Sequence, residues 1–287
     1  MSRAGFNWLF FFLLILSAWI GLAGYSVYES SNSVVPTGHL GALDPMFDVE
    51  FWRAVCLAAP QDQPFLFLVS MWGVMSIAMM APTAFPMMLN FHWITQSKRQ
   101  QAVNAAKGAN VTPREAGLNG EIGISEYLPF PMLVLGYLSV WLGYSVIAAG
   151  SQYFLASQSL VTEHGLSVSE ELTAALLMVA GAYQFSKFKE ACLSKCRSPL
   201  AYFMGHWRGG SIGAYVMGLH HGMVCVGCCW ALMLLGFVGG TMNLVWMGAA
   251  MLLMIVEKLS DIGRLVTKPL GVLLISASIY VFVRSLL

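Results

Sequence analysis

The run Ile212–Val238 reads IGAYVMGLHHGMVCVGCCWALMLLGFV and contains no lysine, arginine, aspartate or glutamate. A helix that crosses a bilayer needs roughly 20 consecutive apolar residues, and this run is long enough. Within it, the segment Gly218–Trp230 carries three of the chain's six cysteines and two of its six histidines. Thiols and imidazoles at membrane depth lack water partners and therefore mark a candidate functional site. We therefore expect a transmembrane helix that carries a functional site.

The rest of the chain shows the same apolar character. Hydrophobic residues make up 57% of the chain and charged residues only 10%, whereas an average soluble domain carries about 25% charged residues. Isolated strands cannot satisfy their backbone groups in lipid, so the spans must be helices. We predict an all-α, polytopic transmembrane bundle that forms one integral membrane domain, residues 1–287. Its spans are expected at about 6–28, 65–91, 128–156, 172–189, 212–238, 242–258 and 265–283.

The lysines and arginines predict the orientation of these seven spans. With the N-terminus in the cytoplasm, every lysine and arginine except Arg53 and Arg284 falls in a cytoplasmic segment, as the positive-inside rule requires. The C-terminus is then external. The first apolar block is longer than the 7–15 residue core of a signal peptide, so we expect a retained helix. The net charge of +1 gives no indication of nucleic-acid binding.

Helical spacing predicts a stripe of metal ligands on span 212–238. At 100° per residue, the stripe occupies an arc of about 80°, and its members are Met217, His221, Cys225 and Cys228. Cys229 lies on the shoulder of the stripe, and His220 points away. Thiolate, thioether and imidazole are the ligands that suit copper(I) or zinc. We expect the stripe to face the bundle, toward Pro82, because an imidazole in hydrocarbon costs several kcal/mol.

A second pair, Cys192 and Cys196, lies at the cytoplasmic end of the fourth predicted span. The i, i+4 spacing places both thiols on one helical face, and Pro199 should end that helix. The neighbouring cations are Lys189, Lys195 and Arg197. They are expected to lower the pKa of both thiols and to favour thiolate. The pair is a candidate cytoplasmic donor or acceptor of metal.

Methionines in the second predicted span form a third group of soft ligands. Met75, Met79 and Met80 precede Pro82 and Pro86 in MWGVMSIAMMAPTAFP. Prolines inside a span kink the helix and free backbone carbonyls. The methionines could complete or feed the cysteine site, although a methionine stripe also fits simple core packing.

For several other residues we expect a role in packing or a place in a loop, and not a role in metal binding. Glycines beside the cysteines are typical of close helix packing; they are Gly218, Gly222 and Gly227. His206, in GHWRGG, is expected in an interfacial loop rather than in a ligand set. Cys56 stands alone in the predicted outer loop.

Four blocks of this sequence resemble an uncharacterised bacterial family of predicted metal-binding integral membrane proteins. The pattern W-x-x-M-x-x-A-M-M-x-P is matched by Trp72–Pro82, and C-L-x-x-C-R-x-P by Cys192–Pro199. The pattern G-x-x-C-x-G-C-C-W-x-L-M is matched by Gly222–Met233. A W-M pair and a terminal E-K pair correspond to Trp246, Met247, Glu257 and Lys258. The resemblance implies metal binding and the cytoplasmic (inner) membrane of a bacterium.

These patterns favour a membrane protein that binds a transition metal, with copper(I) preferred to zinc, rather than an enzyme. It would act in metal transport, or in metal delivery to a partner, and the expected partner is a metal chaperone or a metalloenzyme. No G-x-x-x-x-G-K-[ST] loop is present, which argues against ATP-driven transport by this chain alone. Two alternatives stay open. One is a thiol–disulfide oxidoreductase that relays electrons across the membrane, and the other is an accessory subunit of a membrane complex.

Overall fold

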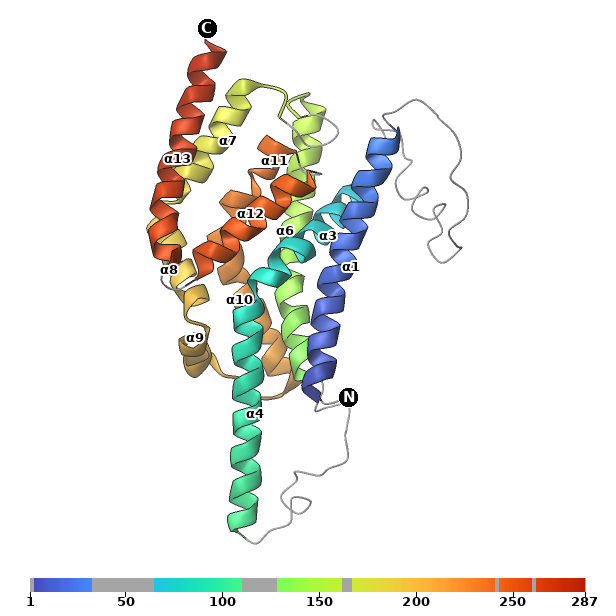
Figure 1. Cartoon of the computed structure of the whole chain (residues 1–287), viewed down its shortest axis with the longest axis vertical. Helices are drawn as coiled ribbons and strands as arrows, with labels where there is room; N and C mark the ends of the chain where they lie inside the picture. Colours follow the sequence, from blue (N-terminus) through green and yellow to red (C-terminus); the bar gives the residue numbers. More distant parts are fainter. Residues whose placement is uncertain are drawn as a thin grey trace.

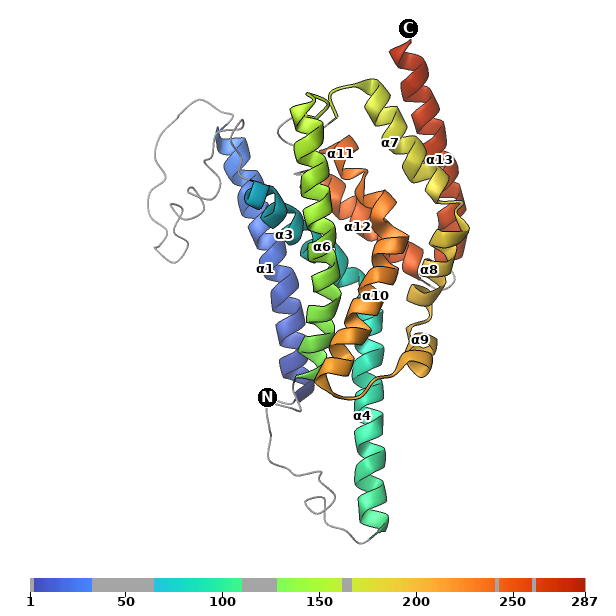
Figure 2. The ribbon, with the colours of Figure 1, turned by 180° about the vertical axis from the view of Figure 1, so that it is seen from behind.

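The computed structural model describes residues 3–32, 65–109, 128–161, 167–240, 243–259 and 262–286. Every regular element in these ranges is a helix, apart from an isolated bridge between Val161 and Ser167. The helices pack side by side as one bundle, and α4 projects beyond it (Figures 1 and 2). The predicted all-α class is confirmed. The predicted outer loop covers residues 30–64, and its residues 33–64, Cys56 among them, lie outside the described residues.

Within the described residues, five helices are long and apolar enough to cross a membrane, at residues 7–24, 65–83, 129–157, 210–239 and 262–285. The predicted spans 172–189 and 242–258 correspond to shorter helices of 14 and 15 residues. The number seven and the orientation remain predictions. The helices are α1 (Arg3–Asn32), α3 (Phe65–Thr83), α4 (Phe85–Gly108), α6 (Pro129–Ser157), α7 (Glu170–Tyr183), α8 (Lys187–Arg197), α9 (Pro199–His206), α10 (Gly210–Met233), α11 (Gly236–Gly239), α12 (Leu244–Lys258) and α13 (Ile262–Ser285).

The two prolines of the second predicted span break it into α3 and α4. Pro82 lacks the N–H that would bond to the carbonyl of Ala78 four residues earlier. The indole Nε1 of Trp19, on α1, donates to that carbonyl oxygen instead at 3.0 Å. Pro86 occupies the first turn of α4, where no N–H is required. The expected kink is therefore a real break, and α4 continues to Gly108, beyond the predicted end of the span at residue 91.

The helix predicted across 172–189 is also interrupted. α7 ends at Tyr183, and α8 begins at Lys187. The hydroxyl of Ser186 accepts a hydrogen bond from the Phe188 N–H at 3.2 Å, so this residue caps a new helix. The interruption changes the direction of the chain and lays α8 against α10 (Figure 2). Both cysteines of α8 are thereby brought to the side of α10.

Glycines set the closest helix contact of the bundle, between α6 and α10. A Cβ atom added at Gly218 would lie 2.1 Å from the Leu133 carbonyl oxygen, and one at Gly136 would lie 2.1 Å from the Tyr215 carbonyl oxygen. At Gly222 it would lie 2.9 Å from Cβ of Val140. Small residues let two helix backbones approach in this way. We call Gly136, Gly218 and Gly222 the glycine seam. It fixes the depth at which α10 sits in the bundle.

Replacing Gly218 with alanine should lower the melting temperature of the purified protein, because the added methyl group overlaps a backbone carbonyl. Overpacking of this kind costs about 1–3 kcal/mol. Gly143→Ala is the matched control, since nothing lies within 4 Å of a Cβ at that position of α6. The control should leave stability unchanged or raise it by about 0.4–1 kcal/mol. Equal melting temperatures for the two variants would contradict the glycine seam.

Candidate metal centre

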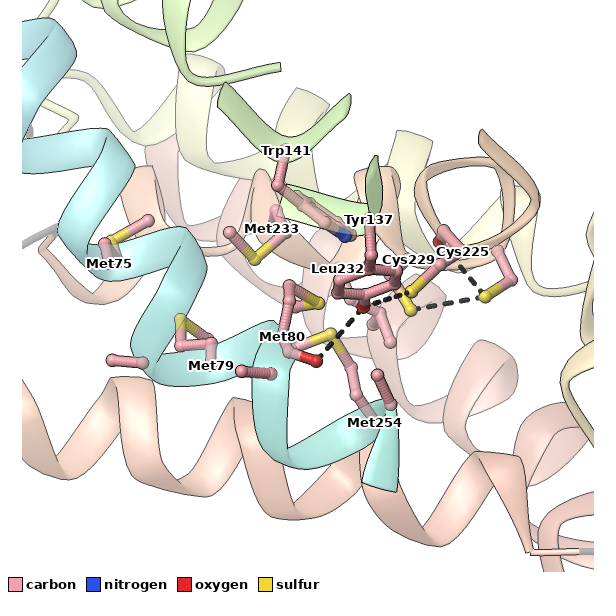
Figure 3. Close-up of a cluster of buried hydrophobic side chains, with 14 of the residues drawn as sticks. Met75, Met79, Met80, Tyr137, Trp141, Cys225, Cys229, Leu232, Met233 and Met254 are labelled. Atoms are coloured by element: carbon pink, nitrogen blue, oxygen red, sulfur yellow. Dashed lines mark hydrogen bonds between the residues drawn. The ribbon is translucent and has the colours of Figure 1, made fainter. Parts of the chain in front are cut away.

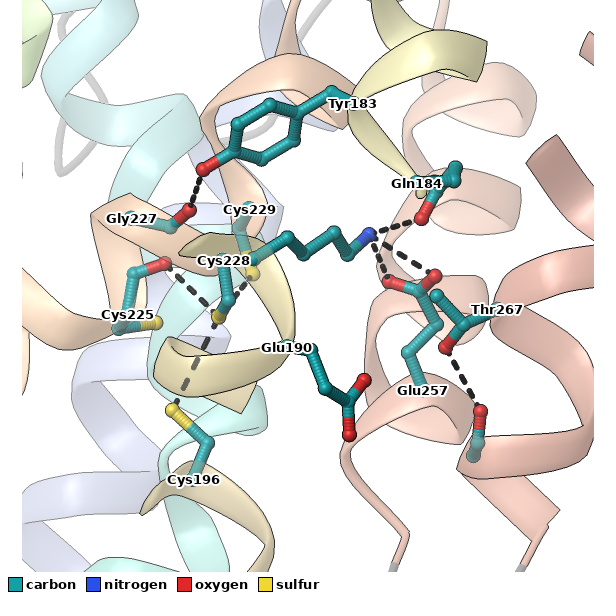
Figure 4. Close-up of polar contacts among 12 residues, drawn as sticks. Tyr183, Gln184, Glu190, Cys196, Cys225, Gly227, Cys228, Cys229, Glu257 and Thr267 are labelled. Atoms are coloured by element: carbon teal, nitrogen blue, oxygen red, sulfur yellow. Dashed lines mark hydrogen bonds and ion pairs between the residues drawn. The ribbon is translucent and has the colours of Figure 1, made fainter. Parts of the chain in front are cut away.

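The cysteines of α10 form a compact buried cluster. The Sγ atoms of Cys225, Cys228 and Cys229 all lie within 4.8 Å of one another, and none of these residues is more than 1% exposed. All described cysteines are free thiols. In the described ranges, this is the one place where three or more histidine, cysteine or acidic ligand atoms come so close together. We call these three residues the thiol cluster (Figure 4).

The pair on α8 joins the thiol cluster. Sγ of Cys196 lies 3.9 Å from Sγ of Cys228. Sγ of Cys192 lies against Gly227 of α10, 2.8 Å from where a Cβ atom would be. The sequence suggested a separate pair at the end of a span, but the turn before α8 folds both cysteines back onto α10. Cys196 is buried, whereas Cys192 is half-buried at the edge of the site.

The expected lowering of the cysteine pKa is wrong for Cys192. Burial raises the pKa of this thiol, and the opposing effect of Lys195 is smaller. Lys189 does not contribute, because its Nζ pairs with the Glu257 carboxylate at 2.9 Å. Arg197 is likewise engaged, since its Nε donates to the Glu257 carbonyl oxygen at 2.9 Å. Two of the three cations therefore face acidic and carbonyl oxygens rather than the thiol.

Alkylation of Cys192 should become fast only at a higher pH in the folded protein than in the denatured protein. The thiolate is the reactive form, and burial keeps the thiol protonated to higher pH. The measurement is iodoacetamide labelling between pH 7 and 10, with the tryptic peptide 190–195 quantified by mass spectrometry. The detergent-denatured chain serves as the reference. A labelling midpoint below that of the denatured chain would show that the cations outweigh burial.

Polar groups from three other helices surround the thiol of Cys225. The ammonium Nζ of Lys258 donates to Cys225 Sγ at 3.1 Å and to the Thr83 hydroxyl at 2.6 Å. The Tyr137 hydroxyl lies 3.1 Å from the same sulfur and donates to the Met80 carbonyl oxygen at 3.0 Å. Lys258 and Tyr137 are buried. The sequence motif contained Lys258, but nothing in the motif indicated this contact.

The other members of the predicted stripe differ in their surroundings. His221 and Met217 are buried, as expected for a stripe that faces the bundle. Nδ1 of His221 has no hydrogen-bond partner within the described structure. A buried ring nitrogen without a partner is costly unless something else binds it. Sδ of Met217 accepts the Arg208 N–H at 3.3 Å, one turn before His221 and away from the thiol cluster.

The methionines of α3 lie beside the thiol cluster. Met75, Met79 and Met80 are buried, and Figure 3 shows Met80 and Met254 between Met75 and the cysteines. A small cavity of about 10 Å³ lies beside them. Four of the residues that line it are methionines, namely Met75, Met79, Met233 and Met247. Sequence reasoning did not place Met233 or Met247 there, because both come from other helices.

A buried ion pair connects α8 to α12. Lys189 and Glu257 are each 1% exposed, and Gln184 accepts a further hydrogen bond from Lys189. Arg197 reaches the Thr267 hydroxyl on α13 at 3.2 Å. These contacts connect α8 with α12 and α13, and Figure 4 shows the hydrogen bonds to Gln184 and Glu257.

The fold and the site together define an all-helical protein with a buried cluster of soft metal ligands and with helices apolar enough for a membrane. A family model described as PpoB2, copper chaperone, matches residues 69–281. The match covers most of the chain, and the protein belongs to this family. Comparisons with curated proteins and with solved structures give no match. The family description and the thiol cluster both suggest metal binding, with copper as the candidate ion.

Proposed function

We propose that this protein binds copper(I) inside a bacterial cytoplasmic membrane and delivers it to a partner metalloenzyme. The observation that carries the proposal is the thiol cluster, whose three sulfurs lie within 4.8 Å of one another away from solvent. Soft thiolates favour copper(I) and zinc over hard cations such as magnesium and calcium. Zinc is the competing ion, because four thiols including Cys196 would match a tetrahedral structural zinc site.

Charge balance supports copper(I) at this depth. One copper(I) ion with two thiolates carries a net charge of −1, which is costly in a medium of low dielectric. The ammonium of Lys258 lies 3.1 Å from Cys225 Sγ and would neutralise that charge. The Tyr137 hydroxyl is hydrogen-bonded to Cys225 Sγ, and the Thr83 hydroxyl accepts a hydrogen bond from Lys258 Nζ. His221 has an unpartnered Nδ1 and would supply a further ligand from the same helix face.

The arrangement of sulfurs supports movement of the ion rather than permanent storage. Half-buried Cys192 adjoins α10 at the edge of the site, and Cys196 lies 3.9 Å from Cys228. A soft ion can pass along such a series by exchange of one thiolate for the next. On the far side, Met80 and the methionine-lined cavity offer thioethers that bind more weakly. In this proposal Cys192 and Cys196 exchange copper with a metal chaperone, and Met75, Met79 and Met80 receive it.

The proposed membrane setting keeps seven spans, with α7 and α12 as the two short ones and the N-terminus in the cytoplasm. The distribution of lysine and arginine supports this orientation. It places α8 and α9 on the cytoplasmic side. A reporter fused within residues 195–210 should be cytoplasmic, and an external signal would contradict the orientation.

Metal analysis of protein purified without oxygen tests the proposal. We expect copper to co-purify after growth in copper, with more copper than zinc per chain and with every cysteine trapped as a free thiol. Negligible copper and zinc would refute metal handling. Stoichiometric zinc that chelators do not remove would instead indicate a structural site.

One observation favours the electron-relay alternative. Cys196 and Cys228 lie on different helices with their sulfurs 3.9 Å apart, so a small movement would allow a disulfide. Its formation would release two electrons and two protons, which a quinone could accept. A Cys196–Cys228 disulfide that forms on addition of quinone and reopens with a thiol reductant would support this function. Its absence under those conditions would leave the copper proposal alone.

A further inference from the structure

Two histidines meet outside the thiol cluster, at the junction of α9 and α10. The ring centroids of His206 and His220 are 5.1 Å apart, with 26° between the ring planes. Tyr202 stacks against both rings, at 5.0 Å from His206 and 5.4 Å from His220. His206 is exposed and His220 is half-buried. The pair therefore opens to the outside while one of its members belongs to the helix of the thiol cluster.

Hydrogen bonds assign the tautomer of both imidazoles. Nδ1 of His206 lies 3.1 Å from the Tyr202 carbonyl oxygen, which only accepts, so this nitrogen carries the proton. The Tyr202 hydroxyl contacts the Met217 carbonyl oxygen at 3.2 Å and Nδ1 of His220 at 2.7 Å. Both contacts are satisfied when the hydroxyl donates to the carbonyl and His220 Nδ1–H donates to the hydroxyl oxygen. Each Nε2 then keeps its lone pair, as in histidines whose other nitrogen is anchored by the protein to ligate a metal.

Tyr202 connects this pair to the buried site. Its hydroxyl reaches the backbone of Met217, and its ring lies 5.5 Å from the ring of His221. Burial raises the pKa of Tyr202 to about 12, so the hydroxyl remains a donor at neutral pH. His221 follows His220 directly and is buried with an unpartnered ring nitrogen. The half-buried imidazole of His220 and the buried imidazole of His221 therefore belong to adjacent residues of α10.

We infer that His206 and His220 form an entry port that captures copper(I) through their Nε2 atoms and passes it inward, by way of His221, to the thiol cluster. Imidazole is a borderline ligand that suits copper, and it binds more weakly than thiolate. The ion would therefore move from weaker to stronger ligands as it enters. This inference rests on the proposed copper function, and it assigns a role to His206 that the sequence did not suggest.

The test is the rate at which the full-length reduced protein takes copper(I) from a coloured copper(I) chelate, followed by stopped-flow absorbance in detergent. The variant His206→Ala/His220→Ala should load more slowly by about tenfold or more, the scale on which metal-site groups act. Its final copper content should equal that of the wild type, because the thiol cluster is intact. His92→Ala is the matched control, a half-buried histidine on α4 that bonds to Gln96.

A second variant separates ligation from packing. His206→Met/His220→Met removes both stacked rings but restores soft ligands, so it should load copper(I) at close to the wild-type rate. Slow loading by this variant as well would show that the rings act structurally and would overturn the port. Wild-type loading by the alanine variant would also overturn it, with the copper function untouched. Absence of copper uptake by the wild type would refute the proposed function, and the port with it.

Discussion

The Cys225→Ser/Cys228→Ser variant should bind no copper under conditions in which the wild-type protein retains it. The two sulfurs belong to the thiol cluster, and Cys225 is also the sulfur that contacts Lys258. Serine has nearly the shape of cysteine, but its hydroxyl is a hard ligand with little affinity for copper(I). The loss should therefore exceed the 10- to 100-fold weakening that follows removal of groups around a metal ligand. Equilibrium competition with a copper(I) chelator measures the affinity.

Cys56→Ser is the matched control, because it removes a thiol that belongs to neither cysteine group. We expect this variant to bind copper like the wild type. The melting temperature of the double variant should also be measured, since loss of binding is informative only if the bundle remains folded. Wild-type copper affinity in a folded double variant would remove the thiol cluster from the proposed function.

The Glu257→Gln variant should be destabilised by about 3–5 kcal/mol, because it leaves the ammonium of Lys189 buried without its carboxylate. The pair is 2.9 Å apart, and each side chain is 1% exposed. Replacing both residues by apolar ones of similar volume, Lys189→Met/Glu257→Leu, should recover most of that loss. Thermal and denaturant unfolding of the purified protein measure both effects. A double variant as unstable as the single one would show that the pair contributes more than charge neutralisation.

The ion pair between Glu190 and Arg197 provides a comparison on the same helix. Its oxygen and nitrogen are 3.1 Å apart, but the Glu190 side chain is 57% exposed. Solvent screens such a contact, so Glu190→Gln should cost about 1 kcal/mol or less. A large effect of Glu190→Gln would mean that the contrast between the two pairs does not follow burial.

Apolar runs and helical periodicity were sufficient to predict the class of fold and the inner face of α10. Both depend on spacing along a single helix, which a sequence contains in full. Pro82 and Pro86 predicted a kink within one span in the same way, but not that the chain would divide there into α3 and α4. The turn before α8 was not predicted, because the cap that creates it is a single serine, Ser186, which resembles many others in the chain.

The residues that surround the thiol cluster could not be predicted from the sequence, because they lie far apart in the chain. Lys258 lies 33 residues from Cys225, and Tyr137 lies 88 residues from it. Sequence reasoning used Lys189 and Lys258 as markers of the cytoplasmic face. The structure buries both, at 1% and 8% exposure. Each lysine has a specific partner in the interior, and only tertiary packing brings those partners to it.

The glycine seam bears on whether the fold of the protein would depend on a bound metal ion. In small zinc domains the metal organises the chain, so removal of the ion unfolds the protein. Here the contact between α6 and α10 through Gly136, Gly218 and Gly222 is made by the chain itself and holds the cysteine-bearing helix against α6. In the proposed copper function, helix packing rather than the bound ion would therefore preserve the geometry of the site. A protein with the proposed function would then release its ion without unfolding and could bind the next one.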